Sequence, residues 1–139
     1  MSAGAPADGA ALGPWTLEAV DPDAMRAMGE LLADPNPIHF DADAARAAGL
    51  GDRPINQGPA NFGYVLEMLR AAVPGATVRD LDVRLLGQVA AGDRVVAAGR
   101  VEETRDEDGV LRIVCAVWLD VDGGSRALDG TAVLTLPRG

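Results

Sequence analysis

The sequence has no lysine, a single histidine, a single cysteine, and aromatic residues at only 4% of its 139 positions. The absence of lysine excludes Schiff-base chemistry and a lysine acting as a general base. Because there is one cysteine, no internal disulfide can form, and Cys115 is expected to be a small core residue within its apolar stretch. One histidine and one cysteine are too few for a usual zinc site, so we expect no bound metal.

Long hydrophobic segments and an excess of positive charge are also missing. No run approaches the length of a membrane-spanning helix, and residues 1–14 lack the cationic and apolar regions of a signal peptide. The net charge of −9 disfavours binding to nucleic acid or to anionic membranes. We therefore expect a cytoplasmic protein whose partners are neither nucleic acids nor membranes.

The length and composition are those of one globular domain, with 48% hydrophobic and 24% charged residues. Residues 1–13, rich in alanine and glycine, are expected to form a disordered lead, and residues 14–139 a single domain with a sizeable core. The small and β-branched side chains that supply most of the bulk suit a sheet wrapped closely round a helix.

Helical patterns occupy the first half of the chain. The sequence Asp21-Pro22-Asp23 offers caps for a helix over residues 24–32. Asp41 or Asp43 can cap a short helix over residues 44–48. The most apolar helix is predicted over residues 59–72, with its proline in the first turn, where proline is tolerated.

Alternating patterns dominate the second half, after an opening strand near the N-terminus. An Asp-Gly pair at residues 108–109 predicts a hairpin turn. The predicted strands span residues 15–17, 80–85, 95–104, 110–121 and 125–136. These elements indicate an α+β fold with an antiparallel sheet.

The segment Asp34-Pro35-Asn36-Pro37-Ile38-His39 contains the only histidine and an acid five residues before it. Its two prolines fix φ, remove backbone donors and push the residues before them toward extended geometry. The result is a stiff loop that can hold a carboxylate and an imidazole at a set separation. Such a pair can move protons near neutral pH, so Asp34 and His39 are the candidate catalytic residues.

The pattern Asp34-x-Asn36-Pro37-Ile38-His39-x-Asp41 resembles the signature loop of the MaoC-like, or hydratase 2, family. That family comprises (R)-specific enoyl-thioester hydratases and dehydratases with a hot-dog fold, in which a curved antiparallel sheet wraps a long central helix. The resemblance extends over residues 17–137 as a pattern of elements. It implies that Asp34 and His39 form the catalytic pair, and that the protein is a homodimer.

Two positions depart from the family pattern. Ala33 precedes the aspartate where glycine is common. Gln57 and Pro59 flank Gly58 where histidine and methionine are common. The second departure lies next to the expected substrate carbonyl and concerns the identity of the substrate more than the reaction.

The implied reaction is the reversible hydration of trans-2-enoyl thioesters of coenzyme A or acyl carrier protein to (R)-3-hydroxyacyl thioesters, without metal or redox cofactor. Asp34 and His39 would activate water, and the backbone N–H of Gly58, at the start of the long helix, would stabilise the oxyanion. Asn36 is expected to orient Asp34 or to brace the loop. The candidate substrate-binding residues are Asn56, Gln57, Phe62 and Leu66.

Two alternatives remain open from the sequence. A hot-dog thioesterase would need an acid on the long helix, and Glu67, late in that helix, is the only one. A non-catalytic subunit of a heterodimeric dehydratase would typically lack the Asp/His pair that is present here.

Overall fold

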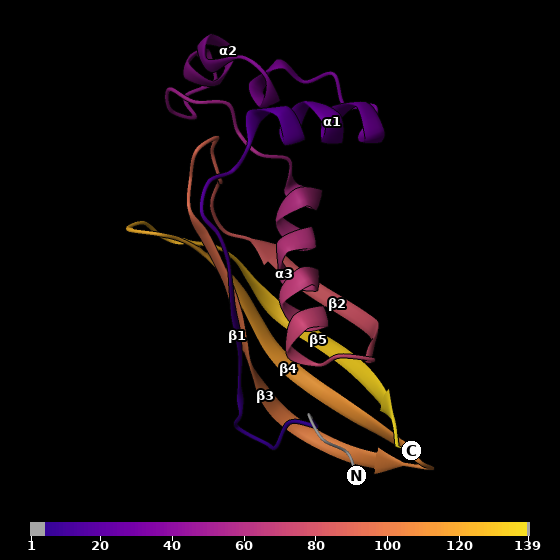
Figure 1. The fold of residues 1–139 in the computed structure, drawn as a ribbon. Helices are drawn as coiled ribbons and strands as arrows, with labels where there is room; N and C mark the ends of the chain where they lie inside the picture. Colours follow the sequence, from indigo (N-terminus) through magenta and orange to yellow (C-terminus); the bar gives the residue numbers. More distant parts are fainter. Residues whose placement is uncertain (1–4, 139) are drawn as a thin grey trace.

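The computed structural model describes residues 5–138. One five-stranded antiparallel sheet in the order β1-β3-β4-β5-β2 curves around helix α3 (Figure 1). The strands and helices are β1 (Ala11–Leu17), α1 (Pro22–Leu32), the 3-10 helix η1 (Pro37–His39), α2 (Ala42–Ala47), α3 (Gly58–Ala72), β2 (Thr77–Leu85), β3 (Val95–Glu107), β4 (Val110–Val121) and β5 (Arg126–Pro137). The predicted α+β architecture, a long helix wrapped by a curved antiparallel sheet, is confirmed.

Strict alternation of side chains builds the sheet. In β4 every second residue is buried, which places one row of side chains against α3 and the other on the outer face. Cys115 belongs to the inner row and is fully buried, as predicted. Burial raises the pKa of its thiol to about 11, with a smaller contribution from Glu102.

Helix α3 packs its apolar side on the concave face of the sheet. Val65, Met68 and Leu69 are buried there in the main core together with the inner rows of β3, β4 and β5. None of the helices within residues 5–138 has the length and apolar character that a membrane-spanning helix needs.

The ordered chain begins earlier than the sequence suggested. β1 starts at Ala11, inside the stretch that was expected to be a disordered lead, and Gly9 already donates its N–H to the carbonyl of Val101 at 2.8 Å. The small residues of this segment give no strand pattern of their own. The strand forms because it pairs with β3, which lies far away in the sequence. The first four residues of the expected lead lie outside the described part of the chain.

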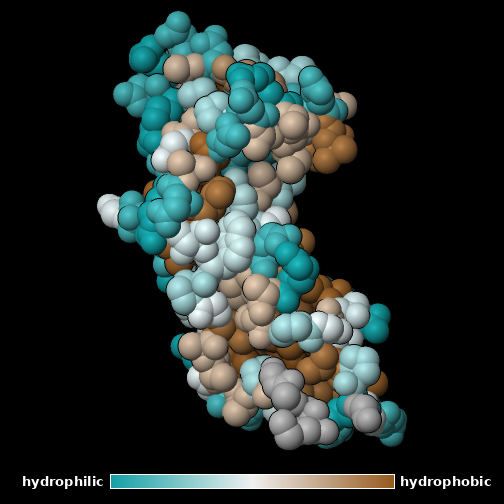
Figure 2. All heavy atoms as spheres, in the orientation of Figure 1, coloured by the Kyte–Doolittle hydropathy of each residue, from teal (hydrophilic) through white to brown (hydrophobic). Residues whose placement is uncertain are grey.

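Helices α1, η1 and α2 form an overhang at one end of the sheet, above the start of α3 (Figure 1). The predicted caps are present: the side chains of Asp21 and Asp41 accept hydrogen bonds from the N–H groups of Asp23 and Asp43, both at 2.9 Å. Figure 2 shows the surface hollowed between this overhang and the lower part of the molecule. The overhang carries the loop that the sequence identified as functional.

Candidate active site

The end of helix α1 places Asp34. Ala33 takes a left-handed conformation, with φ 51° and ψ 42°, and ends the helix. The N–H of Asp34 then donates to the carbonyl of Gly29 at 2.9 Å. The aspartate is therefore fixed to the last turns of α1, and its position follows that of the helix.

His39 lies at the end of η1 and faces Asp34. Its Nε2 is 3.2 Å from Oδ2 of Asp34, and its Nδ1 is 2.6 Å from the carbonyl oxygen of Ile55. A carbonyl oxygen can only accept a hydrogen bond, so Nδ1 carries a proton and Nε2 is the atom that exchanges a proton with the carboxylate. The structure thus brings together the two residues that the loop motif singled out.

Asn36 connects both ends of the loop. Its N–H donates to Oδ1 of Asp34 at 3.1 Å, and its side-chain oxygen accepts from the N–H of Ile38 at 3.2 Å, which caps η1. These contacts hold the carboxylate on one side and the helix that carries His39 on the other. They are what a bracing role requires.

The two members of the pair differ in accessibility. The side chain of Asp34 is 34% exposed and that of His39 only 10%. Asp34 opens into a hollow of about 460 Å³ that is lined further by Arg26, Gly29, Glu30, Ala33, Pro35 and Phe40. The carboxylate is thus the partner that solvent or a ligand reaches first.

Gly58 is the first residue of α3, as expected for a backbone donor at a helix start. No carbonyl one turn earlier in the helix can accept its N–H, and the helix dipole adds partial positive charge there. A Cβ added at Gly58 would lie 3.4 Å from Cδ1 of Leu85, so a side chain there would be in close contact with β2.

Asn56 and Gln57 are both buried, and each has its amide nitrogen engaged within the protein. Nδ2 of Asn56 donates to Oδ1 of Asn61 and to the hydroxyl of Tyr64, both at 3.0 Å. Nε2 of Gln57 donates to the carbonyl of Met25 in α1 at 2.8 Å. Neither side chain lines the hollow at Asp34.

Phe62 and Leu66 also lie away from the pair. Phe62 is partly buried against the main core. Leu66 is exposed and lines a hollow of about 210 Å³ with Leu69, Arg70, Ala76, Val78 and Leu134. The structure therefore places these two candidates along α3, separate from the hollow that Asp34 lines.

A third cavity, of about 330 Å³, lies between α1, β1 and α3 and shares no lining residue with the hollow at Asp34. Asn56 and Tyr64 line it, and burial raises the pKa of the Tyr64 hydroxyl while its hydrogen bond with Asn56 opposes the shift. Glu67, the acid of the thioesterase alternative, also lines this cavity and is 2.7 Å from Arg70. Within residues 5–138, no three carboxylate, imidazole or thiol groups gather in a way that would ligate a metal ion.

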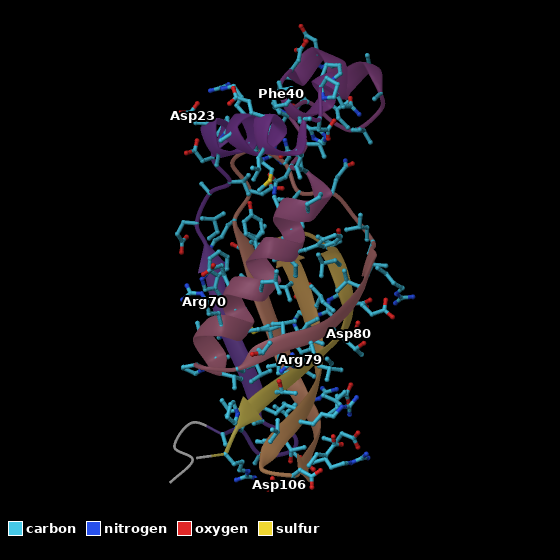
Figure 3. All side chains as sticks on the ribbon, turned by 90° about the vertical axis from the view of Figure 1, so that its right-hand side faces the viewer. Asp23, Phe40, Arg70, Arg79, Asp80 and Asp106 are labelled. Atoms are coloured by element: carbon cyan, nitrogen blue, oxygen red, sulfur yellow. The ribbon has the colours of Figure 1, made fainter. Side chains whose placement is uncertain are left out.

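Three contributors to the site were not found from the sequence. Gly29 in α1 allows the ring of Phe40, the neighbour of His39, to pack against the helix backbone. Phe40 lies in the overhang, at the opposite end of the molecule from Asp106 in β3 (Figure 3). The third contributor is the carbonyl of Ile55. A glycine inside a helix is costly and was a usable clue, whereas a backbone carbonyl leaves no trace in a sequence.

The curved antiparallel sheet around one long helix is the hot-dog fold. The family described as "MaoC like domain" matches residues 16–117. The chain therefore belongs to the MaoC-like family of hydratases and dehydratases, which confirms the resemblance of the Asp34–His39 loop. No sequence among the curated proteins matches this chain.

Solved structures support the same fold. The (R)-hydratase from A. caviae involved in PHA biosynthesis has a TM-score of 0.84 at 22% identity, covering 96% of this chain and 98% of its own. R-hydratase PhaJ1 from Pseudomonas aeruginosa has a TM-score of 0.83 at 20% identity, covering 96% of this chain and 84% of its own. The ChsH1-ChsH2 complex from Mycobacterium tuberculosis has a TM-score of 0.76 at 23% identity, covering 96% of this chain and 100% of its own. At this level of identity the likeness establishes the fold.

Proposed function

We propose that this protein catalyses the reversible hydration of trans-2-enoyl thioesters, carried by coenzyme A or by acyl carrier protein, to (R)-3-hydroxyacyl thioesters. The observation that supports it most is the contact between Oδ2 of Asp34 and Nε2 of His39. Two proton-transfer groups face each other, and one of them, Asp34, lines a hollow, in a member of a hydratase and dehydratase family. The (R)-hydratases among the similar structures agree with this reaction.

In this reaction Asp34 and His39 hold one water molecule. The water oxygen forms a bond to the β-carbon of the substrate while one water proton passes to the pair. The pair returns a proton to the α-carbon, so that both parts of water add from the same side. Because Nδ1 of His39 is held by Ile55, the proton exchange takes place at Nε2.

Negative charge develops on the thioester oxygen during the addition. We place this oxygen at the N–H of Gly58, where the start of α3 provides a free donor and partial positive charge. The missing side chain of Gly58 lets the thioester approach. Asn36 keeps the carboxylate of Asp34 oriented through its own N–H.

The test is the loss of conjugated-thioester absorbance from crotonyl-CoA and from a longer trans-2-enoyl-CoA. Asp34→Asn and His39→Ala are each expected to lose roughly two to four orders of magnitude in kcat. Asp43→Asn is the matched control, because this exposed aspartate lies in the same overhang and its carboxylate pairs with Arg46. It should retain wild-type activity.

An inactive wild type on both substrates would contradict the proposal for coenzyme A thioesters. The same variants are then compared on an enoyl-acyl carrier protein and after co-expression with a partner hot-dog subunit, since the ChsH1-ChsH2 structure is a complex of two chains. Hydrolysis of a saturated acyl-CoA that depends on Glu67 would favour the thioesterase instead.

We also propose a homodimer formed through β2. This strand is at one edge of the sheet, where its outer backbone groups are open to pairing with another strand. Exposed apolar side chains gather along it and next to it: Leu66, Val78, Leu85 and Leu86. Sedimentation of the wild type should give the mass of two chains, and Leu85→Lys should shift it toward one; a monomeric wild type would contradict the proposal.

A further inference from the structure

One short segment, residues 55–58, contacts His39 and helix α1 and begins helix α3. The carbonyl of Ile55 holds His39, the side chain of Gln57 holds α1 through Met25, and Gly58 begins α3. The segment is itself tied to the body of the protein, because the N–H of Asn56 donates to the carbonyl of Val89 at 2.7 Å. It is therefore a fixed reference from which the overhang is positioned.

Gln57 is linked to Asp34 through the backbone of α1. Its Nε2 binds the carbonyl of Met25, one helical turn before Gly29, and the carbonyl of Gly29 accepts the N–H of Asp34 at 2.9 Å. A shift of α1 relative to Gln57 would thus carry Asp34 with it. The ring of His39 is held separately by Ile55, so such a shift would change the separation of the pair.

The orientation of the Gln57 amide is determined by its partner. The carbonyl of Met25 can only accept, so Nε2 must face it and Oε1 must face away. Gln57 is only 1% exposed, and its Oε1 has no hydrogen-bond partner among the described residues. A buried acceptor without a partner costs about 1–3 kcal/mol. An apolar side chain of similar shape would avoid that cost, so stability alone does not explain a glutamine here.

We propose that Gln57 is a positioning residue that sets the separation of Asp34 from His39 and from the N–H of Gly58 by holding helix α1. This inference rests on the hydratase function proposed above. It predicts that the donor of Gln57 matters for turnover more than for folding or for substrate affinity, because misplacing a reacting group by about 1 Å can cost up to about 100-fold in rate.

The experiment compares wild type with Gln57→Met, which keeps the shape and burial but cannot donate to Met25. We expect kcat on crotonyl-CoA to fall about 10- to 100-fold, with KM within about twofold of wild type. Val65→Ala, a truncation of another fully buried side chain on α3, is the control for lost stability. It should lower the melting temperature and leave kcat unchanged.

A second readout does not depend on activity. Since His39 is the only histidine, its ring nitrogens give one pair of signals in a long-range proton–nitrogen NMR spectrum without assignment. Gln57→Met should move the Nε2 signal, which senses Asp34, and leave the Nδ1 signal, which senses Ile55. Should Gln57→Met fail to fold, Gln57→Leu takes its place, because leucine is also apolar and lacks the donor.

A Gln57→Met protein with wild-type kcat and an unmoved Nε2 signal would overturn the inference and leave Gln57 a structural residue. If wild type is inactive on enoyl thioesters, the hydratase proposal fails separately, and the Nε2 signal alone decides whether Gln57 positions the pair. A change in both ring signals together would also contradict the inference, because it would mean a general loosening of the overhang.

Discussion

Nδ1 of His39 lies 2.6 Å from the carbonyl oxygen of Ile55, and this one contact decides which ring nitrogen can work with Asp34. The carbonyl accepts a hydrogen bond from Nδ1, so Nε2 is directed at the carboxylate, 3.2 Å away. A hydrogen bond between these two atoms needs one proton shared by the pair. The group that fixes the imidazole is thus the main-chain carbonyl of Ile55, which lies in a different loop.

The first prediction concerns this tautomer. In the neutral imidazole Nδ1 should carry the proton and Nε2 should carry none, because only Nδ1 has an acceptor that cannot donate. The long-range proton–nitrogen NMR spectrum of the single histidine measures this directly. A neutral ring protonated at Nε2, with a bare Nδ1, would contradict the arrangement.

The second prediction concerns Gly29. A Cβ there would lie 2.8 Å from Cε1 of Phe40 and still closer to Cζ, so Gly29→Ala must displace the ring next to His39. We expect kcat on crotonyl-CoA to fall by about tenfold or more. In Gly63→Ala, the added Cβ meets nothing within 4 Å, and this control should keep its activity and gain about 0.5–1 kcal/mol in stability. Equal activity of the two variants would show that the packing of Phe40 is irrelevant to catalysis.

The third prediction concerns Ala33, whose φ of 51° is strained for any residue with a Cβ. Ala33→Gly should raise the free energy of unfolding by about 0.5–1 kcal/mol, as measured in urea. The control is Ala48→Gly at the end of α2, where φ is −82° and glycine brings no relief. If Ala33→Gly gains no more than the control does, the end of α1 does not have this geometry.

The fourth prediction concerns alkaline stability. Burial raises the pKa of the Cys115 thiol from 9.0 to about 11, so the folded protein holds this proton more tightly than the unfolded chain does. The stability contributed by the neutral thiol is present below pH 9.0 and is lost as the pH rises toward about 11. Between pH 9 and about 11, the free energy of unfolding measured in urea should therefore fall less steeply for Cys115→Ala than for wild type. Parallel curves would mean that the thiol does not contribute.

Much of the architecture could be predicted from local patterns. The period of two in β4 and the Asp-Gly turn before it describe a hairpin whose pairing needs only neighbouring segments, and the predicted residues 110–121 match the strand. The helix predicted over residues 59–72 differs from α3 by one residue at its start. β1 was placed too late because its sequence is weak and its stability comes from β3, distant in the chain.

The sequence by itself determined the catalytic candidates, because two prolines, an acid and the only histidine within six residues force them into one stiff loop. It also determined the caps and the buried cysteine. Only the tertiary structure decided what orients them: the carbonyl of Ile55 on His39, the amide of Gln57 on α1, and the absent side chain of Gly29 beneath Phe40. These contacts join segments far apart in sequence and depend on backbone atoms and close packing, which local patterns of side chains do not reveal.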